Sequence, residues 1–141
     1  MSEPDCTCQV TLYLKGDELQ PDVLTGILGV DATKGHEKGD RRRLPSGSEV
    51  IEKSGMWKLV RHGDASDVSS MVEDLLRYVH EAGRTVGDLP GVEFGFVDVL
   101  VMRSTDGDGG GSCELRLTAA VAGSLAKVGL AMEVTFAVVK P

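Results

Sequence analysis

The feature that most constrains the fold is a long apolar stripe in residues 66–82, SDVSSMVEDLLRYVHEA. Its apolar side chains recur at positions i, i+3, i+4, i+7, i+8 and i+11, and this spacing places them on one continuous face of an α-helix. The members of that face are Val68, Met71, Val72, Leu75, Leu76 and Val79. Ser66 is a candidate N-cap and Gly83 a candidate stop. Such a helix must bury its apolar face against another layer of the fold.

Segments with a period of two supply that layer. Residues 8–15 alternate between apolar and polar side chains, which predicts a strand with one buried face. Cys8, Val10, Leu12 and Leu14 form that face. Further strands are predicted at 55–62, 92–102, 113–117 and 130–139. In the last strand we expect the even-numbered side chains to point inward, namely Leu130, Met132, Val134, Phe136 and Val138.

Two shorter helices complete the set of elements. One begins at Pro21, whose missing N–H has no partner in a first turn anyway, and ends near Gly29. Residues 19–30 overlay residues 117–128 without a gap, which is consistent with an internal strand–helix duplication, although any two short amphipathic helices match to some degree. The predicted fold is an α+β two-layer sandwich, in which an antiparallel or mixed sheet carries helices on one face. A chain of 141 residues is expected to form one domain, 1–141.

Net charge and cysteine content limit the partners and the cellular compartment that we expect for this protein. With 15 Lys and Arg against 22 Asp and Glu, the net charge of −7 argues against nucleic-acid binding. No apolar run reaches the ~20 residues of a membrane-spanning helix, so we expect no membrane partner. Residues 1–7 are expected to be a flexible N-terminus without signal-peptide features. Cys6, Cys8 and Cys113 are odd in number, so we expect reduced thiols and a cytoplasmic protein rather than a disulfide framework.

Motifs that carry catalysis or bind metal are not found in the sequence. There is no nucleophile elbow, phosphate-binding loop or dinucleotide fingerprint. The stretch CTC lacks the second pair of ligands that a zinc site needs, and His36, His62 and His80 are scattered. Residues 105–112, TDGDGGGS, match only the first two ligands of a calcium loop, so a solvated hairpin loop is expected there. We therefore assign no catalytic residue, metal or cofactor.

The segment 31–53 is a long cationic loop without helical period, with a weak hairpin expected around PSGSE. The candidate partner- or ligand-binding residues lie in this loop and just beyond it: Lys38, Arg41, Arg42, Arg43 and Trp57. The arginines can meet an acidic partner or the chain's own carboxylates, such as Asp98 or Glu133, or they can simply be solvated. Trp57 can be an apolar anchor for a partner, but we favour a place in the core through its strand.

The segment 92–102 is apolar on both faces in its second half, which suits a central strand, and Phe94, Phe96, Leu100 and Met102 fall on one of these faces. Asp98 interrupts one face, so we expect either a bulge at Gly95 or a buried carboxylate paired with a cation. We assign seven residues to the sheet face that lacks helices: Tyr13, Val97, Val99, Val101, Thr135, Ala137 and Val139. That face is too apolar to be bare, so we expect the long loop or a second subunit, as in a homodimer, to cover it.

Several short stretches in fixed order resemble a known family. The first of these stretches, LKGDELQPDVLTGILGV, starts at the end of the first predicted strand. The stretches ATKGHEKGD and KSGMWKL follow it, and LAKVGLAMEVTF leads into the last strand. In these stretches the chain is similar to a bacterial family, domain of unknown function 4279, over nearly its whole length. The resemblance implies no activity or cofactor. Small acidic domains of this kind often serve as interaction or immunity modules, which is an analogy at the level of the fold.

The expected function is that of a small cytoplasmic, non-enzymatic binding domain that recognises a protein partner. Neutralisation of a toxin, as by an immunity protein, is one form of that role. The alternative is a binder of a small anionic ligand, or an enzyme of a type that the motifs do not reveal, with its site in the segment 38–57.

Overall fold

The computed structural model describes residues 6–104 and 112–139. In chain order the elements are β1 (Cys6–Gly16), α1 (Pro21–Leu28), β2 (Lys34–His36), β3 (Arg41–Arg43), β4 (Glu49–Ile51), β5 (Gly55–Asp64), α2 (Val68–Glu81), β6 (Phe94–Ser104), α3 (Ala119–Val128) and β7 (Ala131–Val139). Short 3₁₀ turns, Ala65–Asp67 and Val86–Asp88, lie before and after α2. The order confirms the predicted α+β class. Residues 6 and 7 belong to β1 rather than to a flexible N-terminus.

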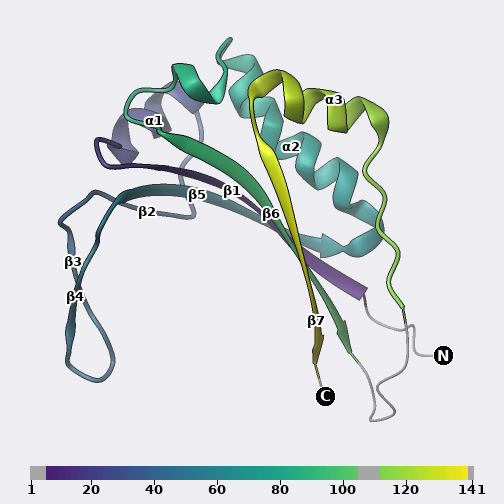
Figure 1. The fold of residues 1–141 in the computed structure, drawn as a ribbon, viewed down its shortest axis with the longest axis horizontal. Coiled ribbons are helices and arrows are strands. Elements are labelled where there is room, and N and C mark those ends of the chain that lie inside the picture. Colours follow the sequence, from purple (N-terminus) through teal and green to yellow (C-terminus); the bar gives the residue numbers. More distant parts are fainter. Residues whose placement is uncertain (1–5, 105–111, 140–141) are drawn as a thin grey trace.

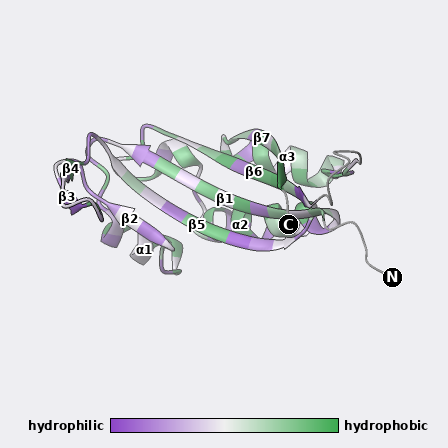
Figure 2. Cartoon of the chain, turned by 90° about the horizontal axis from the view of Figure 1, so that it is seen from below, coloured by the Kyte–Doolittle hydropathy of each residue, from purple (hydrophilic) through white to green (hydrophobic). Residues whose placement is uncertain are grey.

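Five strands form a mixed sheet in the order β2-β5-β1-β6-β7. Its neighbours are antiparallel except for β6 and β7, which run parallel on either side of the α3 crossover. β3 and β4 form a separate antiparallel hairpin, as expected around PSGSE, but the segment 31–53 is not wholly a loop, because Lys34–His36 pairs with β5 in the main sheet. The sheet is arched, and α2 and α3 lie over its convex side (Figure 1). Seen from below, the strands lie in front of the helices, so no helix of residues 6–104 and 112–139 covers the concave face of the sheet (Figure 2).

The core lies between the convex face of the sheet and the helices. The predicted inner face of β1 is confirmed, with Val10, Leu12 and Leu14 each 0 % exposed. The predicted stripe of α2 is buried too, from Val68 to Val79, with Met71 partly exposed. Pro21 begins α1 and Gly29, at φ 71°, ends it. No helix in the described part of the chain is long and apolar enough to cross a bilayer.

The assignment of the two faces of β6 was wrong. Val97, Val99 and Val101 are 0 % to 1 % exposed beneath the helices, whereas Asp98 lies on the concave face. Pairing of β6 with β1 is continuous, so there is no bulge at Gly95. Gly95 has a packing role instead, because a Cβ there would lie 2.9 Å from Leu14 Cδ2 and 3.0 Å from Leu130 Cδ2. Since β6 is apolar on both faces, its periodicity alone could not identify the inner one.

The predicted strand at 113–117 is absent, although its alternation is real. Leu115 and Leu117 pack against the core while the side chains between them are exposed. The segment is held by α2 rather than by a strand. The Ser69 hydroxyl donates to the carbonyl of Arg116 at 2.8 Å and accepts from the backbone N–H of Thr118 at 2.9 Å. Alternation therefore reflects one-sided burial here and not a sheet ladder.

The cysteines also differ from expectation. Cys6 and Cys113 form a disulfide across a sequence separation of 107, which ties the start of β1 to the segment before α3. Cys8 is free and buried. Burial raises the pKa of the Cys8 thiol, and the nearby charges of Asp64 and Asp67 raise it further. The calcium-like loop at 105–112 falls almost wholly outside the described residues.

Replacement of Leu75 by Ala tests the helix–sheet packing. Leu75 is 0 % exposed in α2, so truncation should lower the free energy of unfolding by about 2–5 kcal/mol. Glu73→Ala, on the exposed side of the same helix, is the matched control and should change it by less than about 0.5 kcal/mol. Denaturant titrations of both variants give the comparison. Equal losses would mean that the buried face of α2 is misassigned.

Thiol counting tests the disulfide. In denaturant without reductant, alkylation and mass spectrometry should label Cys8 alone, whereas prior reduction should expose all 3 cysteines. Cys113→Ser should lower the free energy of unfolding by about 2–4 kcal/mol, because the bond closes a long loop in the unfolded chain. Three labelled cysteines before reduction would show that the bond is not formed.

Candidate functional site

The concave face of the sheet is built from aligned rows of side chains. Because β1 pairs continuously with β5 and β6, the residues opposite one another on neighbouring strands share a face. One row crosses the sheet from β2 to β7 and consists of Lys34, Lys58, Tyr13, Phe96 and Ala131. The next row toward the hairpin end consists of His36, Met56, Lys15 and Phe94.

Stacked aromatic rings and three lysines occupy these rows, and two of the lysines lie against the rings. The rings of Tyr13 and Phe96 stack with centroids 4.9 Å apart, and Phe94 lies 6.4 Å from Phe96. Lys15 Nζ is 5.6 Å from the centroid of Tyr13, and Lys58 Nζ is 5.7 Å from it. Phe94 is 55 % exposed, so part of this apolar area faces solvent. We call these five residues the aromatic–lysine platform. They offer a ligand flat apolar area and positive charge together.

The middle of the concave face has the opposite charge. The row there consists of Val60, Thr11, Asp98 and Glu133. Asp98 and Glu133 lie opposite each other on β6 and β7, and neither forms an ion pair with another described residue. Thr11 is only 1 % exposed, and within the described chain its hydroxyl has no hydrogen-bond partner. The face is thus cationic and aromatic at one end and acidic toward β7.

The predicted arginines lie on the β3–β4 hairpin, which projects on the concave side from the end of the sheet that holds the platform (Figure 1). Arg41 pairs with Glu49 at 3.8 Å and Arg42 with Glu52 at 3.2 Å. These partners are carboxylates of the hairpin and its flank, not the Asp98 or Glu133 that the sequence suggested. Arg43 is exposed.

Lys38 and Trp57 complete the set predicted from the sequence. Lys38 pairs with Asp17 at 3.4 Å, at the turn after β1. Trp57 is 0 % exposed, which confirms the core placement, and its indole Nε1–H donates to the hydroxyl of Thr25 in α1 at 3.1 Å. A buried indole is not available to a partner. The structure therefore does not bring Trp57 and the arginines together on one surface.

The platform residues were missed by the sequence reasoning. Tyr13 and Lys15 stood on the polar side of the alternating segment 8–15, which gave no reason to pair them with Phe94 or Phe96. Their proximity depends on the register of three strands far apart in the chain. One signal was present, since both phenylalanines fall on the same face of an alternating strand that also contains a carboxylate.

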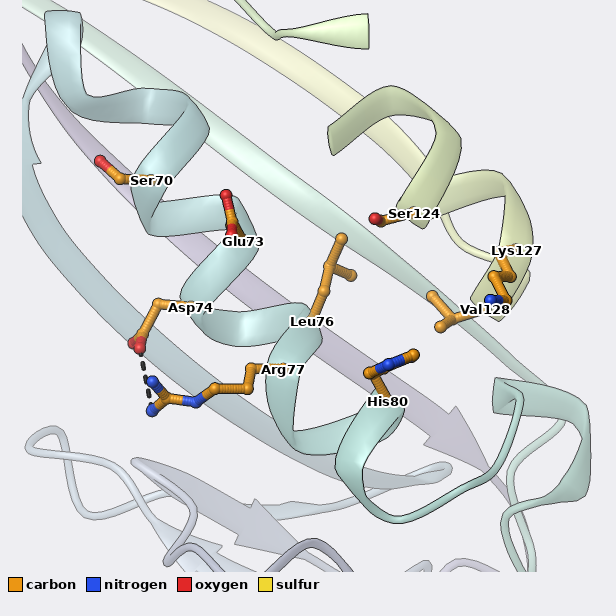
Figure 3. A pocket seen from close by; sticks show the side chains of 9 residues that line it. All are labelled: Ser70, Glu73, Asp74, Leu76, Arg77, His80, Ser124, Lys127 and Val128. Atoms are coloured by element: carbon orange, nitrogen blue, oxygen red, sulfur yellow. Dashed lines mark ion pairs between the residues drawn. The ribbon is translucent and has the colours of Figure 1, made fainter. Parts of the chain in front are cut away.

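A hollow of about 450 Å³ lies between α2 and α3 (Figure 3). Its lining residues are Ser70, Glu73, Asp74, Leu76, Arg77, His80, Ser124, Lys127 and Val128. Asp74 is already paired with Arg77 at 3.1 Å and with Arg61 at 2.8 Å. Arg61 also donates to the Tyr78 hydroxyl, so this network ties α2 to β5. Among the described residues no group of three or more His, Cys, Asp or Glu is placed to hold a metal ion.

Fold and surface together define a small α+β domain with an open, charged and aromatic sheet face. A family model described as a domain of unknown function, DUF4279, matches residues 6–138, so the chain belongs to this family. The resemblance drawn from the sequence motifs is confirmed. No curated protein and no solved structure matches the chain.

Replacing Arg41, Arg42 and Arg43 together by serine tests whether the hairpin arginines hold the fold. Their ion pairs are exposed, and such pairs contribute about 0–1 kcal/mol each, so the free energy of unfolding should fall by less than about 2 kcal/mol. Trp57→Ala, by contrast, should lower it by about 3–5 kcal/mol. If the triple variant unfolds, the arginines are internal structural partners.

Proposed function

We propose that this domain is a binding module that recognises an acidic segment of a protein partner through the aromatic–lysine platform. The observation that carries the proposal is the stack of Tyr13, Phe96 and Phe94 beneath two lysines, on a sheet face without a helix. Aromatic side chains supply much of the energy of protein interfaces. Charged residues at the rim of an interface contribute to specificity and increase the rate of association.

The distribution of charge favours an acidic partner. Lys34 extends the cations of the platform along its own row, and the arginine hairpin adds more at the same end. The chain as a whole has a net charge of −7, so this cationic end stands out against an acidic body. Such a field attracts carboxylates and repels other cationic surfaces.

The acidic row sets a second requirement for the partner. Asp98 and Glu133 lie beyond the platform on the same face, and they would repel carboxylates placed opposite them. A segment that runs along the concave face should therefore carry its acidic residues at the platform end. Neutral or basic residues should face the middle of the sheet.

This role needs no catalysis, and neutralisation of an acidic toxin is one form that it can take. The alternative site, between the hairpin and Trp57, would need the indole to be exposed, and Trp57 is 0 % exposed. The proposed compartment depends on the cysteines. A cytoplasmic protein would keep Cys6 and Cys113 reduced, whereas the disulfide between them favours an oxidising compartment.

A fluorescent peptide that repeats Glu-Tyr-Glu-Ala is a suitable probe, with binding followed by anisotropy. Lys15→Glu combined with Lys58→Glu should weaken binding about tenfold or more, since both ammonium groups lie on the platform. The control, Lys127→Glu combined with Arg116→Glu, changes the net charge equally on exposed residues elsewhere. Equal weakening by both pairs would contradict a specific site, as would failure of the wild-type protein to bind.

The arginine hairpin should act at longer range. The triple Arg→Ser variant should bind the same peptide more slowly and with a weaker dependence on salt, because rim charges act mainly on association. Stopped-flow measurements at low and high salt separate the association and dissociation rates. A faster dissociation with unchanged association would instead place the arginines in direct contact with the peptide.

A further inference from the structure

The two edges of the sheet differ in their protection. Exposed edge strands invite pairing with other chains, and proteins protect them with short strands, lysines, prolines, bulges or inward charges. The β2 edge is three residues long and begins with Lys34. The β7 edge is nine residues long, AMEVTFAVV, and Glu133 is its one charged residue. In the described part of the chain, β7 pairs only with β6.

Large apolar side chains of β7 are exposed. Val134 is 38 % exposed, Phe136 62 % and Val138 63 %. They share the helix-side face with Val99 and Val101, to which Val134 and Phe136 are directly paired. The prediction that they point to this face holds, but the prediction that they are buried was wrong, because the helices do not cover this edge. The apolar surface of the core thus continues outward along β7.

We propose that β7 pairs antiparallel with β7 of a second copy of this chain, so that two sheets become one continuous sheet. The two-fold axis would stand perpendicular to the sheet at the middle of the strand. Backbone N–H and C=O groups on the free edge of β7 would then find partners, and the exposed valines and Phe136 would be shared between the copies.

The sequence of β7 is self-complementary in this arrangement. We therefore infer that the strand paired with β7 comes from a second copy of the chain. With the axis at Phe136, Val134 lies opposite Val138, and Glu133 lies opposite Val139. With the axis at Thr135, Val134 lies opposite Phe136 and Glu133 opposite Ala137. In both registers apolar side chains meet across the strands, and the two carboxylates are kept apart.

The flanking helix α3 adds little charge beside this edge. Among the residues of α3, Lys127 alone is charged, and the exposed positions beside it are mainly alanine. The outer surface of α2, farther from the edge, carries Glu73, Arg77 and Glu81 instead. Two copies can therefore meet along β7 without bringing like charges together. The dimer expected from the sequence is thus placed at a sheet edge rather than at the open face.

The two-fold axis has a consequence for the concave face. An axis perpendicular to the sheet keeps the concave faces of both copies on the same side. The joined sheet would present two aromatic–lysine platforms, one in each copy, to the same partner surface. Pairing through β7 does not depend on what the platforms bind, because β7 contributes only Ala131 to the platform row.

The test compares two exposed phenylalanines on the same sheet. Sedimentation equilibrium over a dilution series should show a dimer for the wild-type chain, and Phe136→Lys should raise its dissociation constant at least about tenfold. Phe94→Lys, at a residue 55 % exposed on the platform, should leave the dimer intact. Val138→Lys provides a second edge variant if Phe136→Lys fails to fold. A monomeric wild-type chain, or a dimer that tolerates both edge variants, overturns the proposal.

Two further measurements locate the interface and separate it from the peptide site. Backbone amides of 131–139 should exchange slowly with deuterium in the dimer and faster on dilution. Phe136→Lys should retain binding of the Glu-Tyr-Glu-Ala peptide, whereas Lys15→Glu combined with Lys58→Glu should weaken it while remaining dimeric. Unchanged exchange in 131–139 across the dilution series would rule out pairing through β7, whatever the peptide does.

Discussion

The pairing of β1 with β5 on one side and β6 on the other is the interaction on which the rest of the structure depends. It places Val10, Leu12 and Leu14 in the core and leaves Tyr13 and Lys15 on the concave face. Because side chains alternate along a strand, a slip of one residue would exchange these two sets. The core and the candidate site therefore lie on opposite faces of the same sheet. Because one strand register sets both, a change of register would disrupt both.

The parts of the fold that the sequence predicted are those buried on one side only. The inner face of β1 and the stripe of α2 could be derived from their periods, because one polar face leaves a single way to bury the other. β6 is apolar on both faces, so its inner side was assigned wrongly. The segment 113–117 alternates but pairs with no described strand. Ser69 holds it beside α2, and the disulfide ties it to the start of β1. Both errors arise because the contacts of these segments are with residues far away in the sequence, and the local pattern of side chains does not specify those contacts.

The candidate site was predicted only in part, for a related reason. Composition alone located the cationic hairpin, but not the short-range pairing of Arg41 and Arg42 with Glu49 and Glu52. The platform draws on β1, β5 and β6, and its residues come together only when the strands are in register. Trp57, the most conspicuous residue in the sequence, serves the core through its bond to Thr25.

With all helices on the convex side, the sheet retains two uncovered surfaces of different chemistry. The platform is charged and aromatic, and its charge is not complementary to itself, so a different protein should occupy it. The β7 edge is nearly uncharged and self-complementary, so a copy of the chain suits it. Binding at these two surfaces should respond differently to salt. Screening weakens attraction to the lysines. In the proposed dimer the exposed Val134, Phe136 and Val138 would become buried, and this burial would be insensitive to screening and strengthened by salts such as sulfate. A dimer held by β7 should therefore persist under conditions that release an acidic partner.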